Sequence, residues 1–411
     1  MDQEARPEGS NDPRIELGRF PFGAKVRHYW RLDEEAIFLN HGSFGATPSP
    51  VLAAQAAWRE RMERQPVLFL AGELPDLQRQ AAAVLAEFVG SRPENLVFVD
   101  NATTGVNAVL RGLDWHAGDR VAATDHLYGA VGQTLTYLAQ RHGYGLDLAH
   151  IPFPLRDERD ILTAWAAVLT PQTRLAVFDH ITSASGLIFP IAQMISLCRA
   201  QGIPVLVDGA HAPGMIPLDL ENLAADWYVG NAHKWLCAPK GCGFLWTHPQ
   251  HQAQTHPTVI SHGYGSGYLA EFDWVGTKDP SSWLAVSAAI EFQHHLGSAA
   301  IRQHNQALAL WAGEHLSRAW GSPLPAPVGM LGSMVAIPLD PQQMPVPPQA
   351  SLSQLAQQIH DWLWQQHRIE VPVYSFQDRL WLRISAQVYN QPHEYERLAD
   401  VLGKGGIPSA W

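Results

Sequence analysis

The chain has 411 residues, of which 46% are hydrophobic and 16% charged, and its formal net charge is -11. A chain of this length and composition can bury a large core and suggests two or three domains. An acidic balance without any block of Lys and Arg argues against nucleic acid as a partner.

The chain ends and the cysteines bear on the cellular compartment. Residues 1–14 are polar and acidic, unlike a signal or transit peptide, and no later stretch reaches the roughly 18 apolar residues of a membrane span. The three cysteines, Cys198, Cys237 and Cys242, show no metal-type spacing, which is typical of free thiols in a reducing compartment. We therefore expect a cytoplasmic protein that binds no membrane and holds no metal.

Three regions are expected along the chain. Residues 1–40 form an N-terminal segment that starts disordered and then packs on a small domain. Residues 41–285 form a large α/β domain, because apolar β-rich runs alternate there with segments of helical period. The predicted strands are 95–100, 119–125, 146–153, 173–181, 203–210, 226–232 and 241–246, and the helices between them are 104–112, 128–142, 158–170 and 190–202. This alternation predicts a largely parallel sheet.

Residues 286–411 are expected to form a small C-terminal α+β domain. A long helical stretch after residue 285 leads into a Pro-rich connection at 323–348. Beyond it, strand, helix, paired strands and helix are predicted at 334–339, 352–367, 369–375, 380–386 and 394–402.

Polar residues recur where the predicted strands of the large domain end. They are Asn101, Thr103, Asp125, His126, His180, Ser183, Asp208, His211, His233 and Lys234. Parallel sheets bind ligands at the carboxyl ends of their strands, so this edge is the candidate site.

Lys234 is the most unusual of these residues, because its neighbours Ala232, Trp235, Leu236 and Cys237 are apolar. Either it reaches the surface along its own stem, or its amine is desolvated, which lowers its pKa and makes it a nucleophile. A nucleophilic lysine invites pyridoxal 5'-phosphate, a cofactor that also needs an acid for its ring nitrogen and donors for its phosphate.

Two further features could meet those needs. Asp208 ends a strand and could protonate a ring nitrogen, although an Asp-Gly pair is also typical of a turn or helix cap. The amides of Ala102 to Thr104 and the Thr103 hydroxyl begin a helix and could bind a phosphate, or they could form an ordinary N-cap.

The order of several motifs resembles the class V aminotransferase superfamily, in its isopenicillin N epimerase-like branch, related to cysteine desulfurases and selenocysteine lyases. The motifs are "FLNHGSFGATP" at 38–48, "NATTGVN" at 101–107, "DHLYGA" at 125–130, "VDGAHAPG" at 207–214, "NAHKWL" at 231–236, "VGTKDPSSWLA" at 275–285 and "LWLRISAQVYN" at 380–390. The resemblance implies fold type I, the aspartate aminotransferase-like fold, with a large mainly parallel seven-stranded sheet domain and a smaller α+β domain.

The resemblance also implies roles for individual residues. Lys234 would be the Schiff-base lysine, Asp208 the partner of the ring nitrogen, and His126, with Tyr128 as the alternative, the residue that stacks on the ring. The phosphate cup would comprise Ala102, Thr103, Asn231 and His233, with Thr277 reaching it from the neighbouring subunit of a homodimer. His211 and Ser183 stand where relatives carry Gln and Asn near the cofactor's phenolic oxygen. Arg383 would bind the substrate carboxylate, with Asn40 and His41 beside the substrate.

The expected reaction begins with abstraction of the α-proton of an amino acid or amino-acid-derived substrate by Lys234, as in the epimerase-like branch. β-Elimination by a C–S lyase, or amine transfer, shares this first step. No cysteine lies in residues 366–382, shortly before Arg383, which argues against a persulfide-forming desulfurase.

Two hypotheses from other classes have less support. A nicotinamide-dependent oxidoreductase would carry a compact G-x-G-x-x-G after an early strand, and the sequence has none there. A non-catalytic binding relative would be expected to lack Lys234 or Asp208, and both are present.

Overall fold

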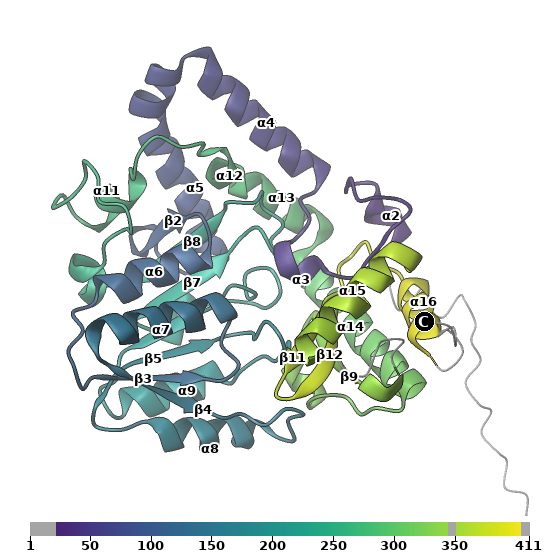
Figure 1. The fold of residues 1–411 in the computed structure, drawn as a ribbon. Helices are drawn as coiled ribbons and strands as arrows, with labels where there is room; N and C mark the ends of the chain where they lie inside the picture. The colour runs from purple at the N-terminus through teal and green to yellow at the C-terminus, as the bar shows by residue number, and fades with distance from the viewer. Residues whose placement is uncertain (1–21, 344–350, 404–411) are drawn as a thin grey trace, which may run out of the picture.

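The computed structural model describes residues 22–343 and 351–403. The predicted disordered start and the last part of the Pro-rich connection lie outside the described residues. Figure 1 shows a large domain built on one sheet and a smaller domain beside it, with α4 extending along the edge of the large domain.

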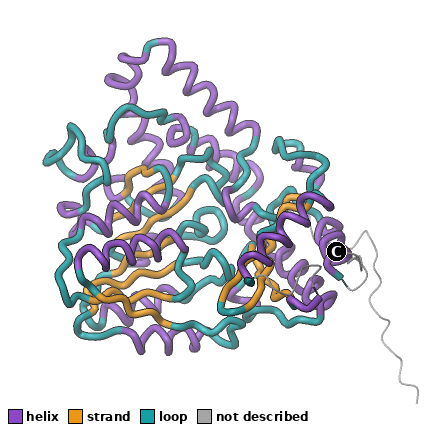
Figure 2. Tube along the Cα trace, in the orientation of Figure 1, coloured by secondary structure: helices purple, strands orange, loops and turns teal. Residues whose placement is uncertain are grey.

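A seven-stranded sheet with the order β2-β8-β7-β6-β5-β3-β4 forms the centre of the large domain (Figure 2). Only β8 runs antiparallel to its neighbours β2 and β7, so the predicted, mainly parallel sheet is confirmed. The strands are β2 (Leu96–Val99), β3 (Arg120–Thr124), β4 (Gly145–Ala149), β5 (Thr173–Asp179), β6 (Val205–Asp208), β7 (Trp227–Asn231) and β8 (Gly243–Thr247).

Helices cover both faces of this sheet, as the near-continuous apolar strands require. Along β2, Leu96 and Phe98 belong to one buried apolar cluster, whereas Val97 and Val99 belong to another on the opposite face. The helices that follow the strands are α6 (Ala102–Gly112), α7 (Gly129–His142), α8 (Glu158–Val168), α9 (Ile191–Arg199), α10 (Leu220–Leu223), η3 (Pro249–Gln254) and α11 (Tyr268–Asp273).

Two parts of the helical structure differ from the sequence prediction. A helical arm before the first large-domain strand was not predicted and comprises α3 (His41–Phe44), α4 (Ser49–Arg64), η1 (Leu68–Glu73), α5 (Leu74–Phe88) and η2 (Pro93–Asn95). After the short α12 (Ser281–Leu284), the long helical stretch after residue 285 is divided into α13 (Val286–Leu296) and α14 (Ser298–Trp320). Gly297 separates the last two with a φ of 86°, a conformation that glycine adopts without strain.

The smaller domain consists of an antiparallel sheet with the order β11-β12-β9, against which α14 and α15 pack. Its elements are η4 (Val328–Met330), β9 (Met334–Leu339), η5 (Pro341–Gln343), α15 (Leu352–His367), β10 (Ile369–Glu370), β11 (Val373–Phe376), β12 (Arg379–Ser385) and α16 (Pro392–Leu402).

The N-terminal part of the described chain lies on the smaller domain. Strand β1 (Ile37–Phe38) pairs in parallel with β10, and the amide of Gly23, just before α2 (Ala24–Arg27), donates to the Val388 carbonyl. Within residues 22–343 and 351–403, no helix combines the length and hydropathy of a membrane span.

Candidate active site

A cavity of about 560 Å³ opens at the carboxyl ends of the central strands. The ends of β5, β6 and β7, the start of α6 and the end of α3 contribute to it. Its lining comprises Ser43, Phe44, Asp100, Asn101, Ala102, Thr103, Thr104, Tyr128, Asp179, Ser183, Asp208, Ala210, His211, Asn231, His233, Lys234 and Gly241. Most of the residues predicted from the sequence for the cofactor therefore share one cavity.

Lys234 follows β7 and is 8% exposed, so its amine does not reach the surface along its stem. Burial, and secondly the nearby Arg383, lower the pKa of the amine to about 8, while Asp208 and Asp179 act in the opposite direction. Its Nζ lies 3.2 Å from Nε2 of His211. A buried amine with a depressed pKa is the state in which a lysine is nucleophilic.

Two carboxylates stand side by side near Lys234. Asp208 at the end of β6 is in register with Asp179 at the end of β5, and both are buried. Burial raises the pKa of both carboxyl groups, and the proximity of Asp208 raises that of Asp179 further. Asp179 was not predicted for the site, although the strand that carries it ends in an acid in the same way as its neighbour does.

The first turn of α6 also lines the cavity. Asn101 caps the helix by accepting from the Thr104 amide at 3.0 Å, and Asn231 accepts from the Ala102 amide at 2.8 Å. His233 lies nearby, with its Nδ1 3.1 Å from the Cys242 carbonyl. The N-terminus of a helix attracts anions because its first amides lack intrahelical acceptors.

Arg383 on β12 lies directly behind the lining of the cavity and is 1% exposed. Its guanidinium donates to the Ser183 carbonyl and lies 3.3 Å from the Ser43 hydroxyl. In the part of the chain that the structure describes, Arg383 has no carboxylate partner and its Nε has no acceptor. A buried guanidinium without a counter-ion is suited to an anion supplied by a ligand.

The segment before α4 contributes different residues from those predicted. Asn40 donates to Glu370 at 2.8 Å, and both ring nitrogens of His41 are engaged, by Tyr389 at 2.8 Å and by the Lys234 carbonyl at 3.0 Å. Neither side chain lines the cavity, whereas Ser43 and Phe44 do. Asn40 and His41 thus hold the segment in place and do not line the cavity.

The glycine of this segment at position 45 permits a close approach to the lysine. Gly45 has a φ of 70°, and a Cβ at this position would lie 2.1 Å from the His233 carbonyl oxygen. Only glycine lets the chain pass this closely to the residue before Lys234.

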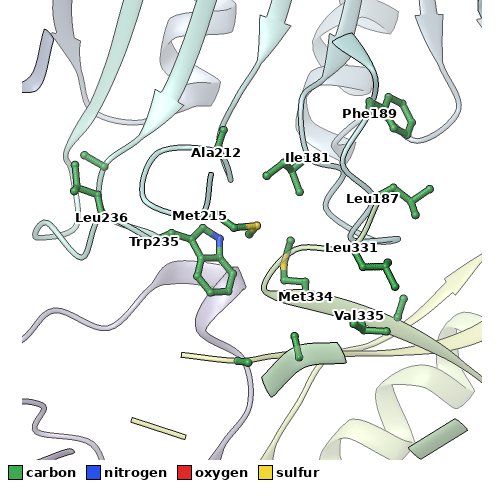
Figure 3. Packing of buried hydrophobic residues seen from close by; sticks show 14 of the residues in the cluster. Ile181, Leu187, Phe189, Ala212, Met215, Trp235, Leu236, Leu331, Met334 and Val335 are labelled. Atoms are coloured by element: carbon green, nitrogen blue, oxygen red, sulfur yellow. The ribbon is translucent and has the colours of Figure 1, made fainter. Parts of the chain in front are cut away.

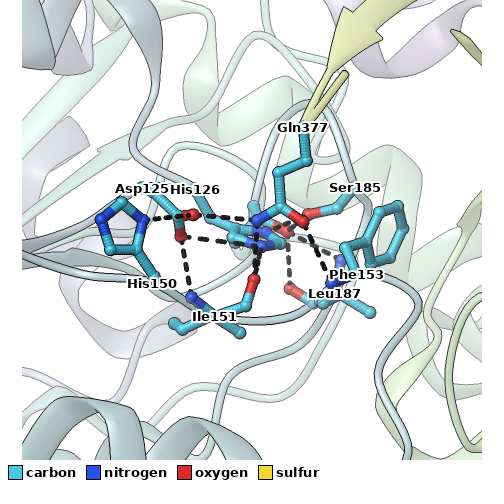
Figure 4. Close-up of polar contacts among 9 residues, drawn as sticks. Asp125, His126, His150, Ile151, Phe153, Ser185, Leu187 and Gln377 are labelled. Carbon is cyan, nitrogen blue, oxygen red and sulfur yellow. Dashed lines mark hydrogen bonds and ion pairs between the residues drawn. The ribbon is translucent and has the colours of Figure 1, made fainter. Parts of the chain in front are cut away.

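His126 does not occupy the place that the sequence suggested (Figure 4). Its ring is buried, with Nε2 3.1 Å from the Ile151 carbonyl and Nδ1 2.7 Å from the Ser185 hydroxyl, and it does not line the cavity. The alternative, Tyr128, does line the cavity and is 42% exposed. The turn after β3 directs His126 inward and brings Tyr128 to the cavity.

Comparison with known families and proteins agrees with this geometry. The model of the family "Aminotransferase class-V" matches residues 46–343. The chain belongs to the class V aminotransferase family. It is 34% identical to the isopenicillin N epimerase of Amycolatopsis lactamdurans over 92% of this chain and 97% of that protein. It is 30% identical to an L-cysteine desulfhydrase of Arabidopsis thaliana over 89% of this chain and 86% of that protein.

A solved structure shows the same fold. The cystine C–S lyase C-DES, in complex with its reaction product cysteine persulfide, superimposes with a TM-score of 0.74 and 25% identity over 90% of this chain and 97% of C-DES. This class V aminotransferase therefore has fold type I, and it is a pyridoxal-phosphate enzyme of the group that includes epimerases and C–S lyases.

A hydrogen-bonded latch joins the two domains of this class V enzyme beside the cavity (Figure 4). The side-chain amide of Gln377, in the turn between β11 and β12, donates to Asp125 at 2.8 Å and to the Ile151 carbonyl at 2.7 Å. It also accepts from the Phe153 amide at 3.1 Å. We call these three bonds the hairpin latch.

Thr277, the residue predicted to reach a neighbouring subunit, is exposed and does not line the cavity of its own chain. The next residue, Lys278, pairs with Asp100, which does line the cavity, and stacks over Trp283 at 3.9 Å.

Proposed function

We propose that this enzyme abstracts the α-proton of an amino acid or amino-acid-derived substrate, in the manner of the isopenicillin N epimerase-like branch. The observation that carries the proposal is the presence of two buried basic groups at the site, the Lys234 amine and the Arg383 guanidinium. Among the described residues, Arg383 has no carboxylate partner. One group can act as base and the other can hold a carboxylate.

The residues around the cavity fit pyridoxal phosphate. Lys234 would hold the aldehyde carbon, Asp208 the ring nitrogen, and the first turn of α6 with His233 the phosphate. Tyr128 replaces His126 as the proposed stacking residue, because it lines the cavity. The bound cofactor supplies an electron sink for a carbanion at the substrate Cα.

The chain's own residues would then do the rest of the work. Arg383, released from Ser183 and Ser43, would bind the α-carboxylate with two parallel N–H donors. This contact would fix the direction of the Cα–H bond toward the Nζ of Lys234. Burial of Lys234 limits the access of water to the amine that takes the proton.

β-Elimination is the second candidate, and the desulfhydrase and C–S lyase relatives favour it. It would use the same residues, since it differs only in whether the substrate carries a leaving group at Cβ. A persulfide relay on a protein thiol has no support, because Cys198, Cys237 and Cys242 are buried and none lines the cavity. Burial raises the pKa of Cys198 and Cys237 to about 12.

We also propose that the enzyme is a homodimer in the cytoplasm. Thr277 is exposed, and the nearby loop exposes Val259, Ile260 and Tyr264, an apolar group that a second copy of the chain would cover. The three unpaired cysteines are in keeping with a reducing compartment.

Two experiments test the proposal. Borohydride reduction followed by peptide mass spectrometry should place a pyridoxyl group on Lys234, and its appearance on Lys240 or Lys278 would contradict the assignment. Incubation with a panel of amino acids in heavy water should return substrate with deuterium and inverted configuration at Cα. Release of pyruvate and ammonia with a sulfur fragment would establish the lyase instead, and amine transfer to a keto acid would overturn both.

A further inference from the structure

The ring of His211 is held between two nitrogen partners. Its Nδ1 lies 3.2 Å from Nε1 of Trp235, and its Nε2 lies 3.2 Å from Nζ of Lys234. All three side chains are buried, and those of His211 and Lys234 also line the cavity.

The partners decide which nitrogen of His211 carries the proton. An indole N–H only donates, so Nδ1 of His211 must accept and cannot carry a hydrogen. A neutral imidazole then carries its proton on Nε2, which points at Lys234. If Lys234 carried an ammonium group, two N–H donors would face each other, because an ammonium group has no acceptor. A neutral amine instead accepts a hydrogen bond from the Nε2–H of His211 through its lone pair.

We propose that the indole N–H of Trp235 holds His211 in the tautomer protonated at Nε2, and that this tautomer favours the unprotonated form of the Lys234 amine. Trp235 is thereby a positioning residue for the nucleophile, although its indole nitrogen does not touch Nζ. The proposal depends on the proposed function in one respect only, namely that the Lys234 amine reacts with the aldehyde of pyridoxal phosphate.

The backbone keeps these three side chains at their distances. Trp235 accepts from Gln293 at 2.9 Å through its carbonyl, and its ring packs beside Met215 and Met334 (Figure 3). The loop that carries His211 is pressed against the same backbone, since a Cβ on Gly214 would lie 2.5 Å from the carbonyl carbon of Trp235. The hydrogen bonds of His211 therefore cannot be exchanged by a small shift of the loop.

The surrounding charges act on Lys234 in both directions. Arg383 opposes a charge on Lys234, whereas Asp208 and Asp179 favour one. Around His211, the charges of Lys234, Arg383, His233 and His41 add to burial, and its pKa lies well below its ordinary value. A second proton on His211 is therefore disfavoured. Trp235 then determines which of the two ring nitrogens carries the single proton.

The test uses the full-length protein labelled with ¹⁵N at histidine and the variant Trp235→Phe, which keeps an aromatic ring and removes the N–H. In the wild type, His211 should show protonated Nε2 and unprotonated Nδ1, before and after loading with pyridoxal phosphate, with its signals assigned by their loss in His211→Gln. In Trp235→Phe the Nδ1-protonated form should become populated. The pH midpoint of pyridoxal phosphate uptake by the cofactor-free protein should rise by about half to one unit, which slows uptake about three- to tenfold below the midpoint.

Trp227→Phe is the matched control, because it removes an equally buried indole bond, to Thr255 at 2.9 Å, elsewhere in the large domain. It should leave both the His211 signals and the uptake midpoint unchanged. A wild-type His211 protonated at Nδ1 would overturn the proposal without recourse to any variant, and so would an unchanged midpoint in a folded Trp235→Phe. If the tautomer is as proposed but the wild type takes up no pyridoxal phosphate, the proposed function fails and the tautomer assignment stands.

Discussion

Replacing Arg383 by Leu is the sharpest test of how the substrate is held. The guanidinium is buried, touches Ser183 and Ser43, and has an Nε without an acceptor in the described chain, so it can offer a carboxylate two charge-assisted hydrogen bonds. At about 1.5–3 kcal/mol for each such bond, the loss amounts to about 3–6 kcal/mol. With about 1.4 kcal/mol for each factor of ten, kcat/KM should fall by about 10² to 10⁴.

The assay is the rate of deuterium exchange at Cα in heavy water, measured against substrate concentration. Arg383→Lys keeps the charge but loses the paired geometry of the two donors, so its kcat/KM should fall by an intermediate factor, about 10 to 10². Arg379→Leu, an exposed position on the same strand, is the control and should change kcat/KM little. If Arg383→Leu is folded by circular dichroism and keeps kcat/KM within threefold, the carboxylate is bound elsewhere.

Three further predictions follow from the site and its surroundings. Asp208→Asn should still take up pyridoxal phosphate, followed by its absorbance, but should lose at least about 10² in α-proton exchange because it no longer stabilises a protonated ring nitrogen; full exchange would refute the assignment. Gln377→Ala removes the hairpin latch and should lower the free energy of unfolding in urea by about 1–3 kcal/mol, while an unchanged value would show that the latch does not hold the domains together. Burial lowers the pKa of His41 and of His180 to about 3, below the 6.5 of the unfolded chain, so their contribution to stability is complete above pH 6.5 and is lost as the pH falls toward 3. At pH 5 each should have lost about 2 kcal/mol relative to pH 7, and equal unfolding free energies at the two pH values would contradict this.

The strands of the large domain could be predicted because each is a short apolar run, and all except the edge strand β4 are largely buried on both faces. Helices α4 and α5 escaped prediction, and in α4 the reason is visible: of its residues only Val51 and Gln55 are buried, so no apolar period marks it. The division of the stretch after residue 285 depends on the backbone of Gly297, which a helical period does not reveal.

The residues that line the cavity could be predicted where they lie at or shortly after the end of a strand, as Asp208 at the end of β6 and Lys234 after β7 do. His126 and Tyr128 follow the same strand two residues apart, and the direction of the turn decides which of them reaches the cavity. Asp179 required the strand register, since it lines the cavity only because β5 and β6 end level with each other.

The hairpin latch also bears on how the substrate preference of such a site can change during evolution. Arg383 lies on the strand that begins at the latched turn, and it also donates to Ser183 of the large domain. If Arg383 binds the substrate carboxylate as proposed, the height at which it holds that carboxylate above Lys234 depends on the contacts between the two domains. A substitution in the turn at Gln377 would shift that height with every residue of the cavity unchanged. Two relatives whose cavities have identical lining residues could for this reason prefer substrates of different length. Attempts to change the substrate preference of this enzyme should therefore vary the turn at Gln377 first and the lining of the cavity second.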